Sequence, residues 1–103
     1  VAVFAFGSVA RSARRAVSLA RERGLRVGLL RPLTLWPFPD REVAELGRRV
    51  RHILVPEMNL GQVAHEVEWA VGGACPVAKL NRVDGEPISP VEILARLEEV
   101  ART

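Results

Sequence analysis

The chain has 103 residues, of which 49% are hydrophobic and 26% are charged. This length supports one domain with one core, and the composition excludes both an intrinsically disordered chain and a membrane protein. The sequence shows no apolar run as long as a membrane span and no cationic-then-apolar leader. Because Val1 opens the chain inside a strand-like run, we expect a piece of a longer polypeptide.

The charge and the cysteine content narrow the function only a little. The net charge of +3 and the isoelectric point of about 10.4 come almost wholly from arginine, since Lys79 is the only lysine. The arginines are scattered over several predicted elements, so charge alone gives little support to nucleic-acid binding. A single cysteine, Cys75, rules out an internal disulfide and a cysteine-based metal cage, and it fits a reducing cytoplasm.

The first half of the chain predicts two strands and two helices. Residues 1–6 are continuously apolar, as in a strand that is buried on both faces. Apolar residues at helical spacing then predict a helix from residue 9 to Gly24, a typical helix stop. A second strand is predicted over 25–30, and Asp40 is the expected N-cap of the second helix.

The link over 29–40 contains three prolines together with Trp36 and Phe38. Each proline fixes its own φ angle and removes an N–H donor, so this proline loop can be neither a helix nor a central strand. It is nevertheless too apolar for a solvated loop. We therefore expect it to lie against its own domain or against a partner.

The second half of the chain continues the alternation. A short buried strand over 53–55 is expected to end at Pro56, and Asn59 with Gln62 forms a capping-box pattern at a helix start. The remaining predicted elements are, in order, a helix that ends at Gly72 and Gly73, an edge strand over 77–83, a turn at Asp84 and Gly85, and a final helix that begins with the capping box over 89–92.

Strands that alternate with helices predict an α/β fold of three layers, with a mainly parallel four-stranded sheet covered on both faces. We expect the strand order 2-1-3-4. Functional loops leave the carboxyl ends of the strands in such sheets. The proline loop and the loop over 56–62 both satisfy this condition.

Several possible sites have a simpler structural interpretation beside the functional one. Gly7 and Ser8, with Arg11 and Arg14 nearby, could hold a phosphate at a helix start or form an ordinary turn beside a solvated basic face. The glycines of dinucleotide and P-loop motifs are missing. The two histidines lack metal-ligand spacing.

The carboxylate of Glu57 follows a buried strand, so it either bonds backbone N–H groups of its loop or faces a partner. Trp36 and Phe38 either fold back as a local cluster or insert into another chain. Trp69, on the polar face of its helix, is either an interface anchor or half-exposed against a neighbouring loop.

Four segments together resemble the α subunit of 2-oxoacid:ferredoxin oxidoreductases, the 2-oxoglutarate type above all. The two long ones are Val-Gly-Leu-Leu-Arg-Pro-Leu-Thr-Leu-Trp-Pro-Phe-Pro over 27–39 and Ile-Leu-Val-Pro-Glu-Met-Asn-Leu-Gly-Gln over 53–62. The shorter segments over 6–11 and 83–88 are similar in the same order. The match covers almost the whole chain and implies a single domain of the transketolase C-terminal type, the C-terminal domain of such a subunit.

The resemblance implies a role in an enzyme that oxidatively decarboxylates a 2-oxoacid to acyl-coenzyme A and reduces ferredoxin. The whole enzyme would use thiamine diphosphate, magnesium, an iron–sulfur cluster and coenzyme A. This domain would hold no cofactor and no catalytic residue. Its partners would be the other α-subunit domains, the β subunit and, through the complex, ferredoxin, in a cytoplasmic oligomer.

The candidate interface and loop residues lie on the two loops and the helix after them: Arg31, Thr34, Trp36, Phe38, Glu57, Asn59, Gln62 and Trp69. Two other interpretations stay open. A 2-oxoacid dehydrogenase β chain or a transketolase-like enzyme has a related strand–loop pattern but a different loop after the third strand. A freestanding basic module would bind nucleic acid in a strongly salt-dependent way.

Overall fold

The computed structural model describes residues 1–32, 35–58, 61–82 and 86–102. Strands and helices alternate along the chain: β1 (Ala2–Phe4), α1 (Val9–Glu22), β2 (Gly28–Leu30), α2 (Asp40–Arg49), β3 (Ile53–Glu57), α3 (Gln62–Val71), β4 (Val77–Asn81) and α4 (Pro90–Ala101). The candidates Thr34 and Asn59, and the predicted turn at Asp84 and Gly85, lie outside the described residues.

The four strands form one sheet in the order β2-β1-β3-β4, and every neighbouring pair is parallel. Val3 on the first strand pairs with Leu29 on one side and Leu54 on the other. β4 lies at an edge, as its polar sequence predicts. The predicted fold class and strand order are therefore confirmed.

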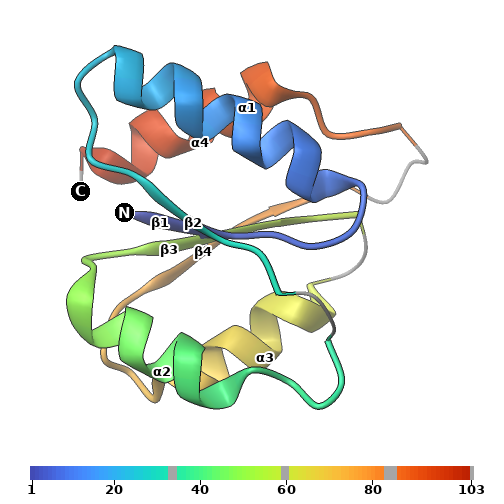
Figure 1. Cartoon of the computed structure of the whole chain (residues 1–103), viewed down its shortest axis with the longest axis vertical. Helices are drawn as coiled ribbons and strands as arrows, with labels where there is room; N and C mark the ends of the chain where they lie inside the picture. The colour runs from blue at the N-terminus through green and yellow to red at the C-terminus, as the bar shows by residue number, and fades with distance from the viewer. Residues whose placement is uncertain (33–34, 59–60, 83–85, 103) are drawn as a thin grey trace.

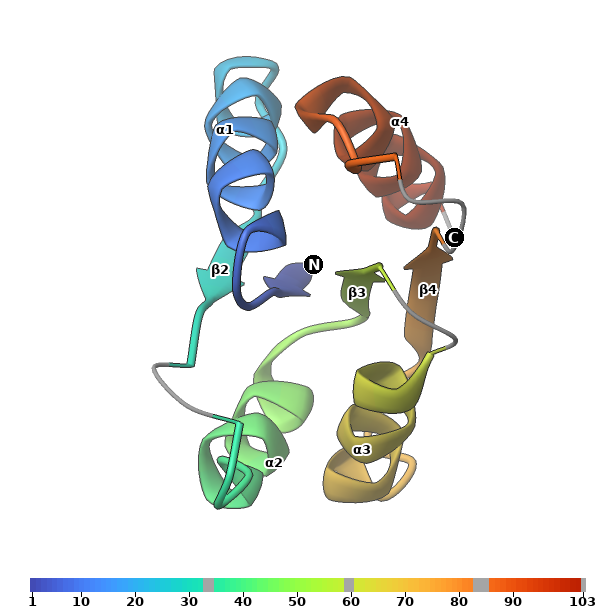
Figure 2. The same ribbon diagram turned by 90° about the vertical axis from the view of Figure 1, so that its right-hand side faces the viewer.

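Two helices cover each face of the sheet (Figures 1 and 2). Alternate residues of a strand point to opposite faces. Val3 and Leu54 accordingly belong to the core under α1 and α4, whereas Phe4 and Ile53 belong to the core under α2 and α3. The sheet is thus apolar on both sides, which explains its continuous hydrophobic strands.

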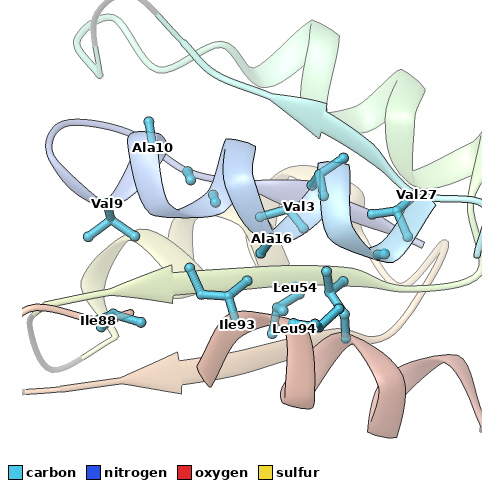
Figure 3. Packing of buried hydrophobic residues seen from close by; sticks show 14 residues of the cluster. Val3, Val9, Ala10, Ala16, Val27, Leu54, Ile88, Ile93 and Leu94 are labelled. Atoms are coloured by element: carbon cyan, nitrogen blue, oxygen red, sulfur yellow. The ribbon is translucent and has the colours of Figure 1, made fainter. Parts of the chain in front are cut away.

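The α1 side of the sheet is closely packed because α1 presents small side chains to it. Ala13, Ala16 and Ala20 are fully buried along one stripe of this helix. Figure 3 shows Ala16 and Val3 near Leu54, with Ile93 contributed by α4. Burial of a side chain such as Ile93 stabilises the fold by about 1.5–3 kcal/mol.

The structure corrects four details of the sequence prediction. The strands over 1–6, 25–30 and 77–83 are shorter than expected, at Ala2–Phe4, Gly28–Leu30 and Val77–Asn81. Asp40 is the first residue of α2 rather than its N-cap, which is Pro39. β3 continues through Pro56 to Glu57. α3 begins after Gly61, whose φ of 90° is left-handed, so Gln62 is its first residue and not its third, as the predicted capping box requires; the other half of that box, Asn59, lies outside the described residues.

The extension of β3 through Pro56 has a simple geometric reason. The carbonyl of Glu57 accepts a hydrogen bond from the N–H of Arg82, on the β4 side. Because successive residues of a strand direct their backbone groups to opposite sides, the nitrogen of Pro56 faces the β1 side. Pairing with β1 ends at Leu54, so the missing N–H removes no ladder hydrogen bond.

The ends of two helices follow the sequence signals. Gly24 has a left-handed φ of 86° just after α1. The side chain of Ser89 accepts a hydrogen bond from the N–H of Glu92, and the Glu92 carboxylate accepts one from the N–H of Ser89, so the predicted capping box of α4 is confirmed. Among the described residues, the helices are too short or too polar to cross a membrane.

Candidate functional site

The proline loop and the start of α3 form the two walls of an open groove of about 750 Å³ at the carboxyl edge of the sheet. Its lining comes from the proline loop, the residue Phe6 beyond β1, Gly61 with the first turns of α3, and β4: Phe6, Leu35, Trp36, Phe38, Gly61, Gln62, Val63, His65, Glu66 and Lys79. Three of the predicted site residues, Trp36, Phe38 and Gln62, therefore meet in one place. The loops that the sequence singled out share this edge.

The two aromatic residues of the proline loop have different environments. The ring of Phe38 lies 5.7 Å from the ring of Phe4, centroid to centroid, and packs against the core under α2 and α3. Trp36 is 72% exposed, and the peptide bond that follows it, to Pro37, is cis. Phe38 thus attaches the loop to its own domain and leaves the Trp36 indole at the surface.

Glu57 holds the start of α3, which forms the second wall of the groove. Its side chain is fully buried at the end of β3. One carboxylate oxygen accepts a hydrogen bond from the N–H of Val63 at 3.0 Å, and the other accepts from Ala64 at 2.8 Å. These are free N–H groups at the helix start, where negative charge is favourable. Glu57 therefore has the structural role of a helix cap reached across the loop.

The outward face of α3 continues from the groove toward its C-terminal end. Gln62 and His65 are exposed and line the groove. Trp69 lies one turn beyond His65 on the same face and is 81% exposed. This predicted site residue is therefore outside the groove but on the helix face that extends it.

Arg31 does not enter the groove. It lines a second cavity of about 410 Å³, together with Gly7, Ser8, Arg11 and Arg14. The two spaces are neighbours, because Phe6 lines the groove and the next residue, Gly7, lines this cavity. We call the second space the arginine cavity.

Seven lining residues of the groove were not among the predicted site residues: Phe6, Leu35, Gly61, Val63, His65, Glu66 and Lys79. Leu35 and Gly61 belong to the two loops that the sequence singled out, and Val63, His65 and Glu66 lie on the helix that follows. Phe6 comes soon after the first strand, so its position in the sequence could have predicted its place at the carboxyl edge. Lys79 reaches the groove only through packing: it projects from β4, and its ammonium lies 3.3 Å from the carboxylate of Glu68 on α3. No local sequence motif marks Lys79 as a groove residue.

The side chains at this edge offer a contact surface. Within the described ranges, no group of three or more His, Cys, Asp or Glu side chains is placed to hold a metal ion. Cys75 is buried away from the groove, and its burial raises the pKa of the thiol above the ordinary value, which lowers its reactivity. The groove instead combines an exposed indole with polar side chains, which is typical of a protein-binding surface.

Known proteins are similar to this chain in sequence and in fold. Residues 1–93 match the family described as pyruvate:ferredoxin oxidoreductase core domain II. The 2-oxoglutarate synthase subunit KorA of Methanothermobacter marburgensis is 39% identical over 94% of this chain and 26% of its own length. The ketoisovalerate oxidoreductase subunit VorB of Methanothermobacter thermautotrophicus is 38% identical over 98% of this chain and 28% of its own length.

A solved structure has the same architecture. The 2-oxoglutarate:ferredoxin oxidoreductase from Magnetococcus marinus superposes with a TM-score of 0.79 at 23% identity, over 95% of this chain and 17% of that chain. The likeness supports the three-layer fold. The chain spans about a quarter of the length of the relatives named above, at 26% and 28%.

Proposed function

Because the chain belongs to the pyruvate:ferredoxin oxidoreductase core domain II family, we propose that it joins subunits in a 2-oxoacid:ferredoxin oxidoreductase. It would be the C-terminal, non-catalytic domain of the α subunit, in a cytoplasmic oligomer. The whole enzyme would oxidise a 2-oxoacid to acyl-coenzyme A and pass the electrons to ferredoxin. The KorA relative is named a 2-oxoglutarate synthase subunit, which favours 2-oxoglutarate as the substrate.

The substrate preference has little support from this domain itself. The KorA and VorB relatives, whose names refer to different 2-oxoacids, are 39% and 38% identical to the chain. A domain that selected the substrate would be expected to resemble one type more strongly. The near-equal similarity supports a role in assembly rather than in substrate choice.

The observation that carries the proposal is the exposed Trp36 on an anchored loop. An indole that is 72% exposed gains much apolar burial when a partner covers it, and tryptophan is enriched among the residues that dominate interface energies. Because Phe38 already packs against Phe4, little loop ordering remains to oppose binding. The β subunit or a neighbouring α-subunit domain is the expected partner.

The residues present do not fit the metal cofactors of the whole enzyme. An iron–sulfur cluster is normally held by four cysteine thiolates, and this chain has one cysteine. The described residues also contain no group of three or more His, Cys, Asp or Glu side chains that could hold a metal ion. We therefore assign magnesium and the cluster to other parts of the enzyme. The resemblance implies the same for thiamine diphosphate and coenzyme A, and we derive no catalytic step here.

The test is the assembly of the full-length α subunit that carries this sequence with its β subunit. We expect Trp36→Ala to weaken the complex by about tenfold or more, measured by size-exclusion chromatography with light scattering. The matched control is Val91→Ala, since Val91 is 69% exposed on α4, at the other face of the sheet. If the complex with the Trp36→Ala subunit formed at the same subunit concentrations as the wild-type complex, the proposal would be wrong.

A further inference from the structure

Three arginines from two separate elements line the arginine cavity beside the groove. Arg11 and Arg14 are three residues apart, so they share one face of α1, and Arg31 comes from the chain just after β2. We propose that this cavity binds an oxyanion of the phosphate class, carried by a phosphorylated small molecule. The proposal is independent of the assembly role argued above.

The positive charge of the cavity is not neutralised by the part of the chain that the structure describes. Neither Arg11, Arg14 nor Arg31 forms an ion pair there, and the first turn of α1 contains no acidic residue. Elsewhere the chain does pair its arginines, as in Arg23 with Glu98 at 2.9 Å. Three like charges at one cavity repel each other, so a bound anion would reduce the repulsion between the three guanidinium groups.

Neutral donors accompany the arginines. The side chain of Ser8 makes no capping hydrogen bond to α1, so its hydroxyl is available to donate to an anion. A Cβ atom added to Gly7 would meet nothing within 4 Å, so the backbone at Gly7 is open to the cavity. Guanidinium groups with hydroxyl and backbone donors match the several acceptor oxygens of a phosphate.

Two features favour a phosphate over the carboxylates of an acidic protein segment. The arginines line a concave space of about 410 Å³ rather than a flat surface. A phosphate monoester also carries a charge of about −1.5 to −2 on one compact group, whereas a carboxylate brings a single charge. One phosphate group therefore balances most of the three positive charges in the smallest volume.

The test is titration of the 103-residue chain with inorganic pyrophosphate at constant ionic strength, followed by calorimetry and by amide NMR shifts. We expect a dissociation constant on the order of 1 mM or lower, with the largest shifts at Gly7 and Ser8. The double variant Arg14→Gln with Arg31→Gln should weaken binding by about tenfold or more. Arg31→Gln alone is expected to give an intermediate loss.

The matched control is Arg41→Gln with Arg48→Gln, two exposed positions on α2 that remove the same net charge. It should change the pyrophosphate affinity by less than about twofold, because distant exposed charges are largely screened. An equal loss in both double variants, or no saturable binding by the wild type, would overturn the site. So would tighter binding of a hexaglutamate peptide than of pyrophosphate, which would indicate an acidic protein partner. Circular dichroism confirms that each variant is folded.

Discussion

The carboxylate of Glu57 and the backbone N–H of Ala64 are joined by a hydrogen bond of 2.8 Å that connects the end of β3 to the first turn of α3. A second bond of 3.0 Å, from the N–H of Val63, uses the other oxygen. Because Glu57 is fully buried, water cannot replace either bond. The direction in which α3 leaves the sheet, and with it one wall of the groove, depends on this carboxylate.

We predict that Glu57→Gln destabilises the domain by about 1–3 kcal/mol. The amide has nearly the same shape, but it has one acceptor oxygen in place of two. One of the N–H groups of Val63 and Ala64 therefore loses its partner inside the protein, and the start of α3 loses its negative charge. The free energy of unfolding, measured by urea denaturation, checks the prediction.

The control for this substitution is Glu45→Gln on α2, an exposed position whose stability effect should stay within about 0.5 kcal/mol. If the two variants were equally stable, the buried carboxylate would not be the cap that we describe.

The fold could be predicted because its signals are local. Continuous apolar strands and helices with one apolar face are visible in the sequence, and the capping box at Ser89 marks the start of α4. The prediction that β3 ends at Pro56 was wrong because a proline interrupts a strand only where its nitrogen faces a neighbour that is still paired, and β3 is paired at Pro56 with β4 but no longer with β1. Which neighbouring strand is paired at a given residue depends on the tertiary structure and cannot be read from the local sequence.

The site was predicted less completely for the same reason. The sequence placed both loops at the carboxyl edge, and the structure brings Trp36 and Gln62 to one groove. It did not identify the group that caps α3: the carboxylate of Glu57 accepts hydrogen bonds from the N–H groups of Val63 and Ala64, whereas the spacing pointed to Gln62 and to Asn59, which lies outside the described residues. Nor did it bring Arg31 together with the start of α1 in one cavity, although the predicted strand order already placed β2 beside β1.

A second prediction separates the two aromatic residues of the proline loop. Phe38→Ala should destabilise the isolated chain by about 1–3 kcal/mol, because Phe38 is partly buried against Phe4 and the core under α2 and α3. Trp36→Ala should change stability by less than about 0.5 kcal/mol, because the side chain is mostly exposed. Thermal or urea unfolding of both variants measures the contrast. Equal losses would mean that Trp36 also belongs to the core, and would remove the basis for its interface role.

A third prediction concerns the contact between α2 and α3 at Gly47. A Cβ atom at this position would lie 2.7 Å from Cγ1 and 3.0 Å from Cβ of Val71, distances that require the Val71 side chain or the helices to shift. We expect Gly47→Ala to destabilise the domain by about 1–3 kcal/mol, although alanine favours helices. Urea denaturation gives the value.

Two companion variants test whether the close approach is the cause. Gly28→Ala on β2 meets nothing within 4 Å and needs no left-handed φ, so it should be neutral or stabilise by up to about 1 kcal/mol. Val71→Ala should recover part of the loss in the Gly47→Ala background, because it removes the Cγ1 atom that clashes. Strictly additive effects of the two changes would rule out the steric explanation.

The last prediction follows from the buried thiol of Cys75. Burial raises its pKa, so the folded state keeps the thiol proton to a higher pH than the unfolded state does, where the pKa is about 8.5. Since the folded state then binds more protons, this residue's contribution to stability is complete below about pH 8 and declines as the pH rises toward its folded pKa. The difference in unfolding free energy between the wild type and Cys75→Ala should therefore shrink from pH 7 to pH 10. A difference that stays constant over that interval, or rapid alkylation of the folded protein by iodoacetamide at pH 8, would show that the thiol is accessible.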